Sequence, residues 1–154
     1  MHYLAGALLI LQFGMIWLLD KKISIQGLDI LALGLWGIGM VLLFLPIISL
    51  RRKGDVPEKR SYIETEVLVD SGIYAVVRHP QYLGWILMYP VVFLLNPRLE
   101  IAAVGIAGMV CMLLVTKHEE ELLIEKFGEQ YILYMQSVPR LNPFLGILRM
   151  IRRL

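Results

Sequence analysis

The chain has 154 residues, of which 58% are hydrophobic and only 18% are charged, and its net charge is +2. Soluble domains are about 25% charged, so this composition excludes an ordinary soluble domain and predicts a single membrane domain over 1–154. The small net charge predicts no nucleic-acid partner, the one cysteine excludes an internal disulfide, and three scattered histidines without zinc spacing predict no metal.

Two hydrophobic segments occupy the first third of the chain, and residues 1–50 are predicted to form two N-terminal spans. The uncharged run 4–19 is near the short limit for a span. No Lys or Arg precedes this run and no cleavage site follows it, so we expect a retained span. The uncharged run 30–50 is long enough to cross the hydrocarbon core, about 30 Å. Pro46 is expected to kink or end this helix, and its glycines, Gly34, Gly37 and Gly39, to permit close packing.

A long polar loop follows, and residues 51–154 are predicted to form a catalytic region with two further spans and a cytosolic tail. Within the loop, residues 62–69 are rich in β-branched side chains and end at a turn signal, Asp70-Ser71-Gly72. This pattern predicts a short extended segment or a hairpin. A loop of this length inside a compact domain is either disordered or functional.

The third span is predicted to begin at Pro80, which suits the first turn of a helix, and to run to Leu95 with a bend at Pro90. Residues 101–116 form the fourth span. Sixteen helical residues reach only about 24 Å, so we expect this helix to continue through the charged cluster 117–121 to about Phe127.

Gly128 is expected to end or bend that helix, and an amphipathic piece follows over 129–143. The tail 144–154 alternates apolar side chains with arginines, which suits a helix lying on an anionic membrane face. Six Lys or Arg lie in the loop 51–80 and six after the fourth span, against Lys21, Lys22 and Arg98 elsewhere. The positive-inside rule therefore predicts that both termini, the loop and the tail are cytoplasmic.

Two polar clusters, GIYAVVRHPQYLGW at 72–85 and KHEEE at 117–121, border neighbouring spans on the same side, and we expect them to meet. Together they supply carboxylates, aromatic rings and an imidazole. They lack a nucleophilic Ser or Cys beside a base and a phosphate-binding glycine loop. This inventory suits a ligand with a cationic end, a planar ring and hydroxyls, and S-adenosylmethionine is such a ligand.

Residues 66–143 resemble the integral-membrane isoprenylcysteine carboxyl methyltransferase family and its prokaryotic relatives. The resemblance depends on LVDSGIYAVVRHPQYLGW, on the two glutamates before LLIEKFGEQYILY, and on VPRLNP. The hydrophobic runs predict an all-α integral membrane protein of about four transmembrane helices, and the resemblance is compatible with this. The resemblance implies a cytosolic cofactor pocket, formed by the loop before the third span and the helical C-terminal region. The implied activity is methyl transfer from S-adenosylmethionine to a lipophilic or membrane-presented acceptor in a prokaryotic cell membrane.

The resemblance also implies roles for individual residues. Leu68 and Val69 approach the cofactor through their backbone, and Glu119 holds its ammonium group. Glu120 matches a second acidic position with a supporting role. Four more residues line the cofactor pocket, namely Tyr74, His79, Pro80 and Tyr82. If the acceptor is an amine or a thiol, His79 or a water held by a glutamate removes its proton, so His79 and Glu120 are the candidate catalytic residues.

Five further positions are interpreted separately. The family's arginine for the prenylcysteine carboxylate is replaced by Val115, which argues against that substrate. Lys117 is two residues further on and points elsewhere by about 200°. Arg78 is interpreted as a lipid-headgroup or helix-cap anchor. Two tyrosines at helical spacing, Tyr131 and Tyr134, are interpreted as docking residues.

Two other functions are compatible with the sequence. Membrane reductases of the sterol reductase type share a similar RHP-Tyr element and use NADPH, but they usually have ten spans where four are predicted here. A non-enzymatic membrane protein that binds anionic lipid would explain the basic loops but not the carboxylates beside them. The methyl acceptor, the need for a general base and the oligomeric state stay open.

Overall fold

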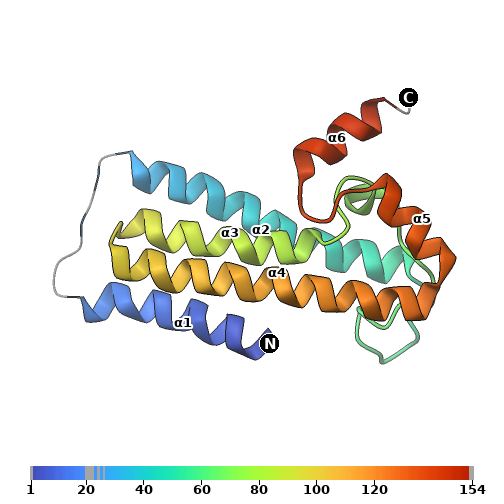
Figure 1. Ribbon diagram of the computed structural model, residues 1–154, viewed down its shortest axis with the longest axis horizontal. Helices are drawn as coiled ribbons and strands as arrows, with labels where there is room; N and C mark the ends of the chain where they lie inside the picture. Colours follow the sequence, from blue (N-terminus) through green and yellow to red (C-terminus); the bar gives the residue numbers. More distant parts are fainter. Residues whose placement is uncertain (1, 20–22, 24, 26, 153–154) are drawn as a thin grey trace. The chain divides into compact units, whose positions relative to one another are not determined.

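All regular structure in the described residues is helical, as predicted. The computed structural model describes residues 2–19, 23, 25 and 27–152, and within these ranges it contains no strand (Figure 1). Lys21, Lys22 and Arg153, which entered the charge count, lie outside the described residues. The elements are α1 (His2–Leu18), α2 (Leu28–Lys53), the 3₁₀ helix η1 (Gly72–Ala75), α3 (Pro80–Leu95), α4 (Leu99–Phe127), α5 (Glu129–Ser137) and α6 (Pro143–Ile151).

Among the described residues, two helices, α2 and α4, are long and apolar enough to cross a membrane. Helices α1 and α3 are apolar but shorter. Large apolar side chains of α2 lie exposed, including Ile30 at 77% and Leu33 at 66%. Exposed apolar surface on this scale suits contact with lipid. Two of the four predicted spans therefore have the length of a full span, and the count of four stays a prediction.

The predicted helix boundaries are largely confirmed. Helix α3 begins at Pro80 and ends at Leu95, and α4 continues without a break through its charged residues to Phe127. Helix α2 runs past Pro46 to Lys53, so it does not end at the proline. A kink at Pro46 or a bend at Pro90 stays a prediction.

The chain divides into two compact units, Met1–Val41 with Gly84–His118, and Leu42–Leu83 with Glu119–Leu154. In the first unit, the buried side chain of Gln12 joins three helices. Its Nε2 donates to the carbonyl oxygens of Tyr89 in α3, at 3.2 Å, and Ile101 in α4, at 2.9 Å. The Tyr89 hydroxyl donates in turn to the Ala5 carbonyl in α1, at 2.8 Å. Such hydrogen bonds between helices offset the desolvation cost of burying polar groups in apolar surroundings.

Small residues allow close packing in this first unit. A Cβ atom added at Gly39 would lie 2.1 Å from the Met88 side chain, and one at Gly108 would lie 2.2 Å from the Tyr89 ring. The predicted packing role is thus confirmed for Gly39. A Cβ at Gly34 or Gly37 would meet no described atom within 4 Å.

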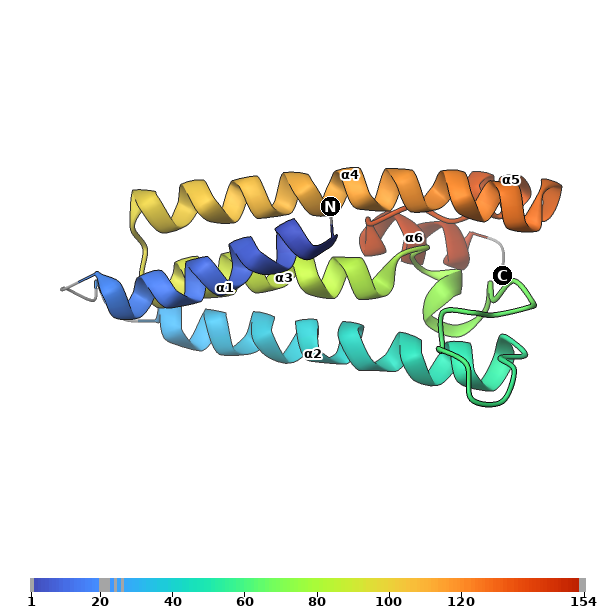
Figure 2. The ribbon, with the colours of Figure 1, turned by 90° about the horizontal axis from the view of Figure 1, so that it is seen from below.

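In the second unit, an irregular segment of residues 54–71 follows α2 (Figure 2). Of the two forms predicted for residues 62–69, the hairpin is wrong, since these residues form turns, bends and irregular structure, and the short extended segment stays a prediction. The backbone amides of Glu66 and Val67 instead both donate to the carbonyl of Gly54, at 2.9 and 3.2 Å. Residues 66 and 67 are therefore tied to Gly54, the residue that directly follows α2, and their amides are not available to pair with a second strand of a hairpin.

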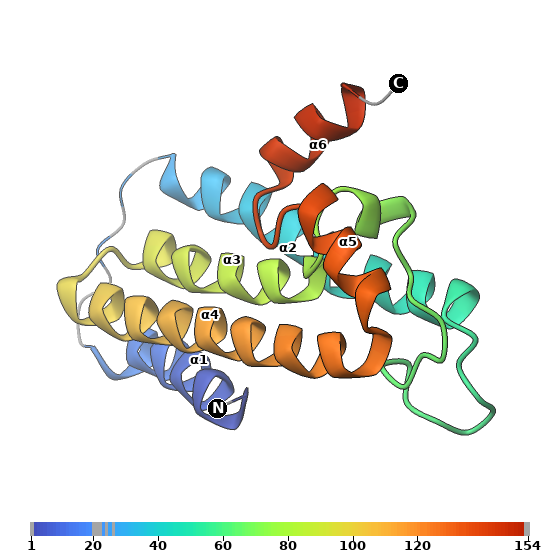
Figure 3. The same ribbon diagram turned by 45° about the vertical axis from the view of Figure 1, so that its right-hand side comes forward.

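Helices α5 and α6 are short and are joined by a turn (Figure 3). Tyr131, Tyr134 and Val138 form a small buried core. Helix α6 begins at Pro143, and the Asn142 side chain caps it by accepting a hydrogen bond from the Leu145 amide, at 3.0 Å. The predicted helical tail is confirmed as far as Ile151, and its location on a membrane face stays a prediction. The apolar side chains of α6 are largely exposed, Phe144 at 83%.

Candidate functional site

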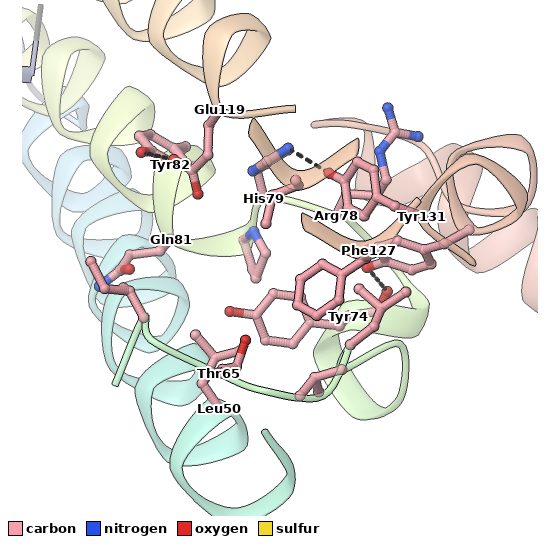
Figure 4. A pocket seen from close by; sticks show the side chains of 16 residues that line it. Leu50, Thr65, Tyr74, Arg78, His79, Gln81, Tyr82, Glu119, Phe127 and Tyr131 are labelled. Carbon is pink, nitrogen blue, oxygen red and sulfur yellow. Dashed lines mark hydrogen bonds between the residues drawn. The ribbon is translucent and has the colours of Figure 1, made fainter. Parts of the chain in front are cut away.

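A pocket that is partly open to solvent lies within the second unit (Figure 4). Its walls come from the ends of α2 and α4, the irregular segment, η1, the first turn of α3 and α5. Seven of the eight predicted site residues line it, namely Leu68, Val69, Tyr74, His79, Pro80, Tyr82 and Glu119. The eighth, Glu120, does not line it.

The two polar clusters of the sequence meet in this pocket, as predicted. The hydroxyl of Tyr82, in the first turn of α3, donates a hydrogen bond to the carboxylate of Glu119 in α4. The rings of His79 and Tyr82 pack edge to face, with centroids 5.7 Å apart. Glu119 is half-buried and reaches the pocket. A carboxylate therefore stands among aromatic rings.

Tyrosines form another wall. The Tyr134 hydroxyl donates to the backbone carbonyl of Tyr74 at 2.6 Å, and the rings of Tyr131 and Tyr134 pack edge to face. Burial is the main reason that the pKa values of the Tyr74, Tyr131 and Tyr134 hydroxyls are raised, so all three are neutral. The predicted docking contact is confirmed for Tyr134. Both C-terminal tyrosines also line the pocket, which their spacing alone did not predict.

Behind the pocket, the carboxylate of Glu120 is bound by two arginines. Its Oε1 accepts hydrogen bonds from Nε and Nη2 of Arg78, at 2.9 and 2.6 Å, and lies 3.3 Å from Nε2 of His79. Its Oε2 accepts from Nε of Arg140 at 2.8 Å and also from Nη2 of the same side chain. The Glu120 side chain is only 3% exposed. Both carboxylate oxygens are thus occupied.

Arg78 does not act as a headgroup anchor, because its side chain is buried and paired with Glu120. The helix-cap interpretation is confirmed in a specific form. Arg78 Nη1 donates to the carbonyl oxygens of Met135, at 2.9 Å, and Val138, which lie at the C-terminal end of α5. A cation at the C-terminal end of a helix donates hydrogen bonds to its free carbonyls and interacts favourably with the negative end of the helix dipole.

The segment before α3 is also tied to the chain after α5 by backbone hydrogen bonds. The amide of Arg78 donates to the carbonyl of Pro139 at 3.0 Å, and the amide of His79 to the carbonyl of Arg140 at 3.2 Å. Arg140 is a further residue of the site that sequence reasoning missed. The only signal for it was its place within VPRLNP, which carried the resemblance without indicating a contact.

The charge state of Glu120 follows from these contacts. Burial would raise the pKa of its carboxyl, but hydrogen bonds from His79, Arg140 and Arg78 outweigh burial and lower the pKa from 4.5 to about 2. Glu120 lies beyond the predicted span 101–116 and is ionised at neutral pH. An ionised carboxylate only accepts hydrogen bonds.

The pocket as a whole offers an anionic group and aromatic faces. Among its described lining residues, Arg78 is the one with a permanent positive charge, and that charge is paired with Glu120. No group of three or more metal-ligating side chains occurs among the residues that the structure describes. The arrangement therefore suits a ligand with a positively charged group and a planar ring.

Comparison with known proteins bears on this geometry. Residues 28–130 match a family model described as phospholipid methyltransferase. The chain is 40% identical over 91 residues to a protein-S-isoprenylcysteine O-methyltransferase of Mus musculus, a match that covers 53% of this chain and 29% of the relative. It is 32% identical over 138 residues to a methanethiol S-methyltransferase of Crocosphaera subtropica, which covers 85% of this chain and 52% of the relative.

The human protein-S-isoprenylcysteine O-methyltransferase is similar at 41% identity over 86 residues, again 53% of this chain and 29% of the relative. The chain thus spans about half or less of the length of these curated relatives. No solved structure matches it significantly.

Proposed function

The chain belongs to the phospholipid methyltransferase family, and on this basis we propose that it transfers a methyl group from S-adenosylmethionine to a lipophilic or membrane-presented acceptor. The observation that carries the donor assignment is the Glu119 carboxylate in a pocket walled by aromatic rings. This combination suits the ammonium group and the adenine of S-adenosylmethionine. The named relatives of the chain are methyltransferases, and no observation favours the NADPH reductase or the lipid-binding alternative.

Each predicted site residue has a role in this proposal. Glu119 would pair with the ammonium group, and Leu68 and Val69 would face the donor through their backbone. Tyr74, His79, Pro80 and Tyr82 would enclose it. When bound, S-adenosylmethionine supplies a methyl group already activated on a sulfonium. The protein's main task is therefore alignment, which is worth effective molarities on the order of 10⁵ M or more.

The identity of the methyl acceptor is less determined than that of the methyl donor. The printed names of the relatives include both an O-methyltransferase for isoprenylcysteine and an S-methyltransferase for methanethiol. In this chain Val115 occupies the position where the resemblance predicts an arginine, and its apolar side chain is buried. Val115 offers no charge to a prenylcysteine carboxylate, so we propose a different lipophilic acceptor.

We further propose a single membrane domain with four spans, in which the shorter helices α1 and α3 join α2 and α4. The excess of basic residues in the loop 51–80 and after the fourth span supports a cytoplasmic location for the pocket and both ends of the chain. The test is a cysteine introduced at Glu125, in a Cys111→Ser background, in sealed vesicles. A membrane-impermeant maleimide should label this cysteine in inside-out vesicles only, and labelling in right-side-out vesicles alone would reverse the orientation.

The donor is tested by calorimetric binding of S-adenosylmethionine and S-adenosylhomocysteine to detergent-purified protein. We expect micromolar affinity, and Glu119→Gln should weaken it at least about thirtyfold, because an unpaired charge in a desolvated site costs about 2 kcal/mol. Glu125→Gln, an exposed carboxylate on the same helix, is the matched control. Folded protein that binds neither adenosyl compound would refute the proposal, and binding of NADPH instead would favour the reductase.

A further inference from the structure

We propose that Nδ1 of His79 is the general base that removes the proton from a thiol acceptor, and that Glu120 orients the His79 ring without contacting either reactant. This inference rests on the proposed methyltransferase function. It assigns the acceptor class that the family membership leaves open.

The contact between His79 and Glu120 determines which ring nitrogen carries the proton. Nε2 lies 3.3 Å from Oε1 of Glu120, a carboxylate that is ionised and can only accept. Nε2 must therefore donate, and the proton of the neutral ring resides there. The Tyr131 hydroxyl, 3.5 Å from the same nitrogen, leaves this assignment unchanged. Nδ1 then holds a free lone pair.

Nδ1 is available to a ligand. The His79 ring lines the pocket although its side chain is only 3% exposed. In the part of the chain that the structure describes, every hydrogen bond of the ring involves Nε2. A buried imidazole with one nitrogen anchored and the other unpaired has the arrangement of a general base positioned by a third group.

Glu120 cannot itself be the base. Its two oxygens accept four hydrogen bonds from Arg78 and Arg140, and it does not line the pocket. Those arginines hold the carboxylate in one position and keep it ionised. Its negative charge then stabilises the His79 ring when that ring takes up a proton. Glu120 is thus a positioning residue.

The charges of the pocket favour an acceptor that is neutral before reaction. A carboxylate acceptor needs a cation to hold it, but the guanidinium of Arg78, the permanent cation among the described lining residues, is committed to Glu120 and to two backbone carbonyls. A carboxylate also has no proton to lose. A base in the pocket is useful only for an acceptor that carries a proton.

Among such acceptors, a thiol is best matched to an imidazole base. The ordinary pKa values of an imidazole and a thiol differ by only about two units, whereas an amine lies about four units above the imidazole. The thiolate, which is the nucleophile, forms easily under these conditions. Apolar lining residues such as Leu50 and Ile63 suit a thiol on a hydrophobic body.

The chemical step balances with these groups. The thiol proton moves to Nδ1 of His79, and the sulfur lone pair forms a new bond to the methyl carbon. The bond from that carbon to the donor sulfur breaks, and its electron pair stays on the donor, which becomes a neutral thioether. The His79 ring leaves the step as an imidazolium beside Glu120 and releases its proton to water.

The experiment compares two acceptors of similar size, benzylthiol and thiophenol, at pH 7 and saturating S-adenosylmethionine. Thiophenol is largely ionised in water at this pH and needs no base, whereas benzylthiol is almost entirely protonated. With a working base, the unmodified protein should methylate both at rates within about tenfold of each other. His79→Gln keeps an amide that can donate to Glu120 but lacks a base. This variant should slow the methylation of benzylthiol by about a hundredfold or more, and the methylation of thiophenol by less than about threefold.

The ratio of the two rates within one variant cancels the fraction of folded protein and any change in donor affinity. Equal losses for both acceptors in His79→Gln would overturn the assignment of a base. An unmodified protein that methylates thiophenol alone would overturn it without any variant. Binding of S-adenosylmethionine without methylation of either thiol would refute the thiol acceptor but leave the proposed function standing. Absence of binding would refute the proposed function itself.

Discussion

Arg78 and Glu120, which are 42 positions apart in sequence, form a buried ion pair with the guanidinium Nη2 2.6 Å from the carboxylate. Through it the segment preceding α3 is joined to α4, and through Arg140 the same carboxylate reaches the chain after α5. Buried ion pairs contribute little net stability compared with apolar packing, but they are costly to break singly. The pair therefore matters mainly because it positions His79.

Replacement of Glu120 by alanine should be strongly destabilising. It leaves the buried charge of Arg78 without its partner and removes the partner of Arg140. A loss of about 3–5 kcal/mol in the free energy of unfolding is expected. Thermal unfolding in detergent measures this, with the exposed Glu125→Ala as control. A loss for Glu120→Ala no larger than that of the control would show that the network is not formed.

Stability should fall in acid because of the same carboxylate. The pKa of Glu120 is about 2 in the folded protein against an ordinary 4.5, so its contribution is fully present above about pH 4.5. The contribution is lost as the pH falls from there toward 2, since protonation then accompanies unfolding. The thermal unfolding midpoints recorded at pH 6, 4 and 3 should decrease less steeply for Glu120→Gln than for the unmodified protein. Parallel curves for the two proteins would contradict this source of acid sensitivity.

Tyr134→Phe should weaken the pocket wall. The variant removes the hydroxyl that donates to the Tyr74 carbonyl at 2.6 Å and leaves a buried acceptor unsatisfied. We expect a loss of about 1–3 kcal/mol in stability. Weaker binding of S-adenosylmethionine should accompany it, because Tyr74 lines the pocket. Unfolding and calorimetry check both effects, and the exposed Tyr3→Phe should change neither.

Gly146→Ala should displace α6. A Cβ atom at this position would lie 1.7 Å from the carbonyl oxygen of Val76, and a backbone atom cannot move aside as a flexible side chain does. Overpacking of this kind costs about 1–3 kcal/mol, and α6 should become more sensitive to protease. Gly34→Ala is the matched control, because a methyl group there meets no described atom. Unchanged proteolysis of α6 would show that the helix does not pack on Val76.

Much of the helical architecture was predictable from local patterns. Long uncharged runs indicated the helices, and Pro80 and Phe127 are ends of α3 and α4 because proline suits a first helical turn and Gly128 follows Phe127. The irregular segment was not predictable in this way. Its β-branched residues suggested a short extended segment or a hairpin, but the amides of Glu66 and Val67 bond to Gly54, a partner that strand propensity does not encode.

The sequence by itself determined the apolar character of the helices, the family, and seven of the residues that line the pocket, since these depend on composition and on a contiguous motif. Only the tertiary structure decided the partners of Arg78, Glu120 and Arg140. Adjacent in sequence, Glu119 and Glu120 look equivalent, yet one lines the pocket and the other is buried behind it. Successive residues on a helix point about 100° apart, so neighbours in sequence face different surroundings, and only the packed chain supplies those surroundings.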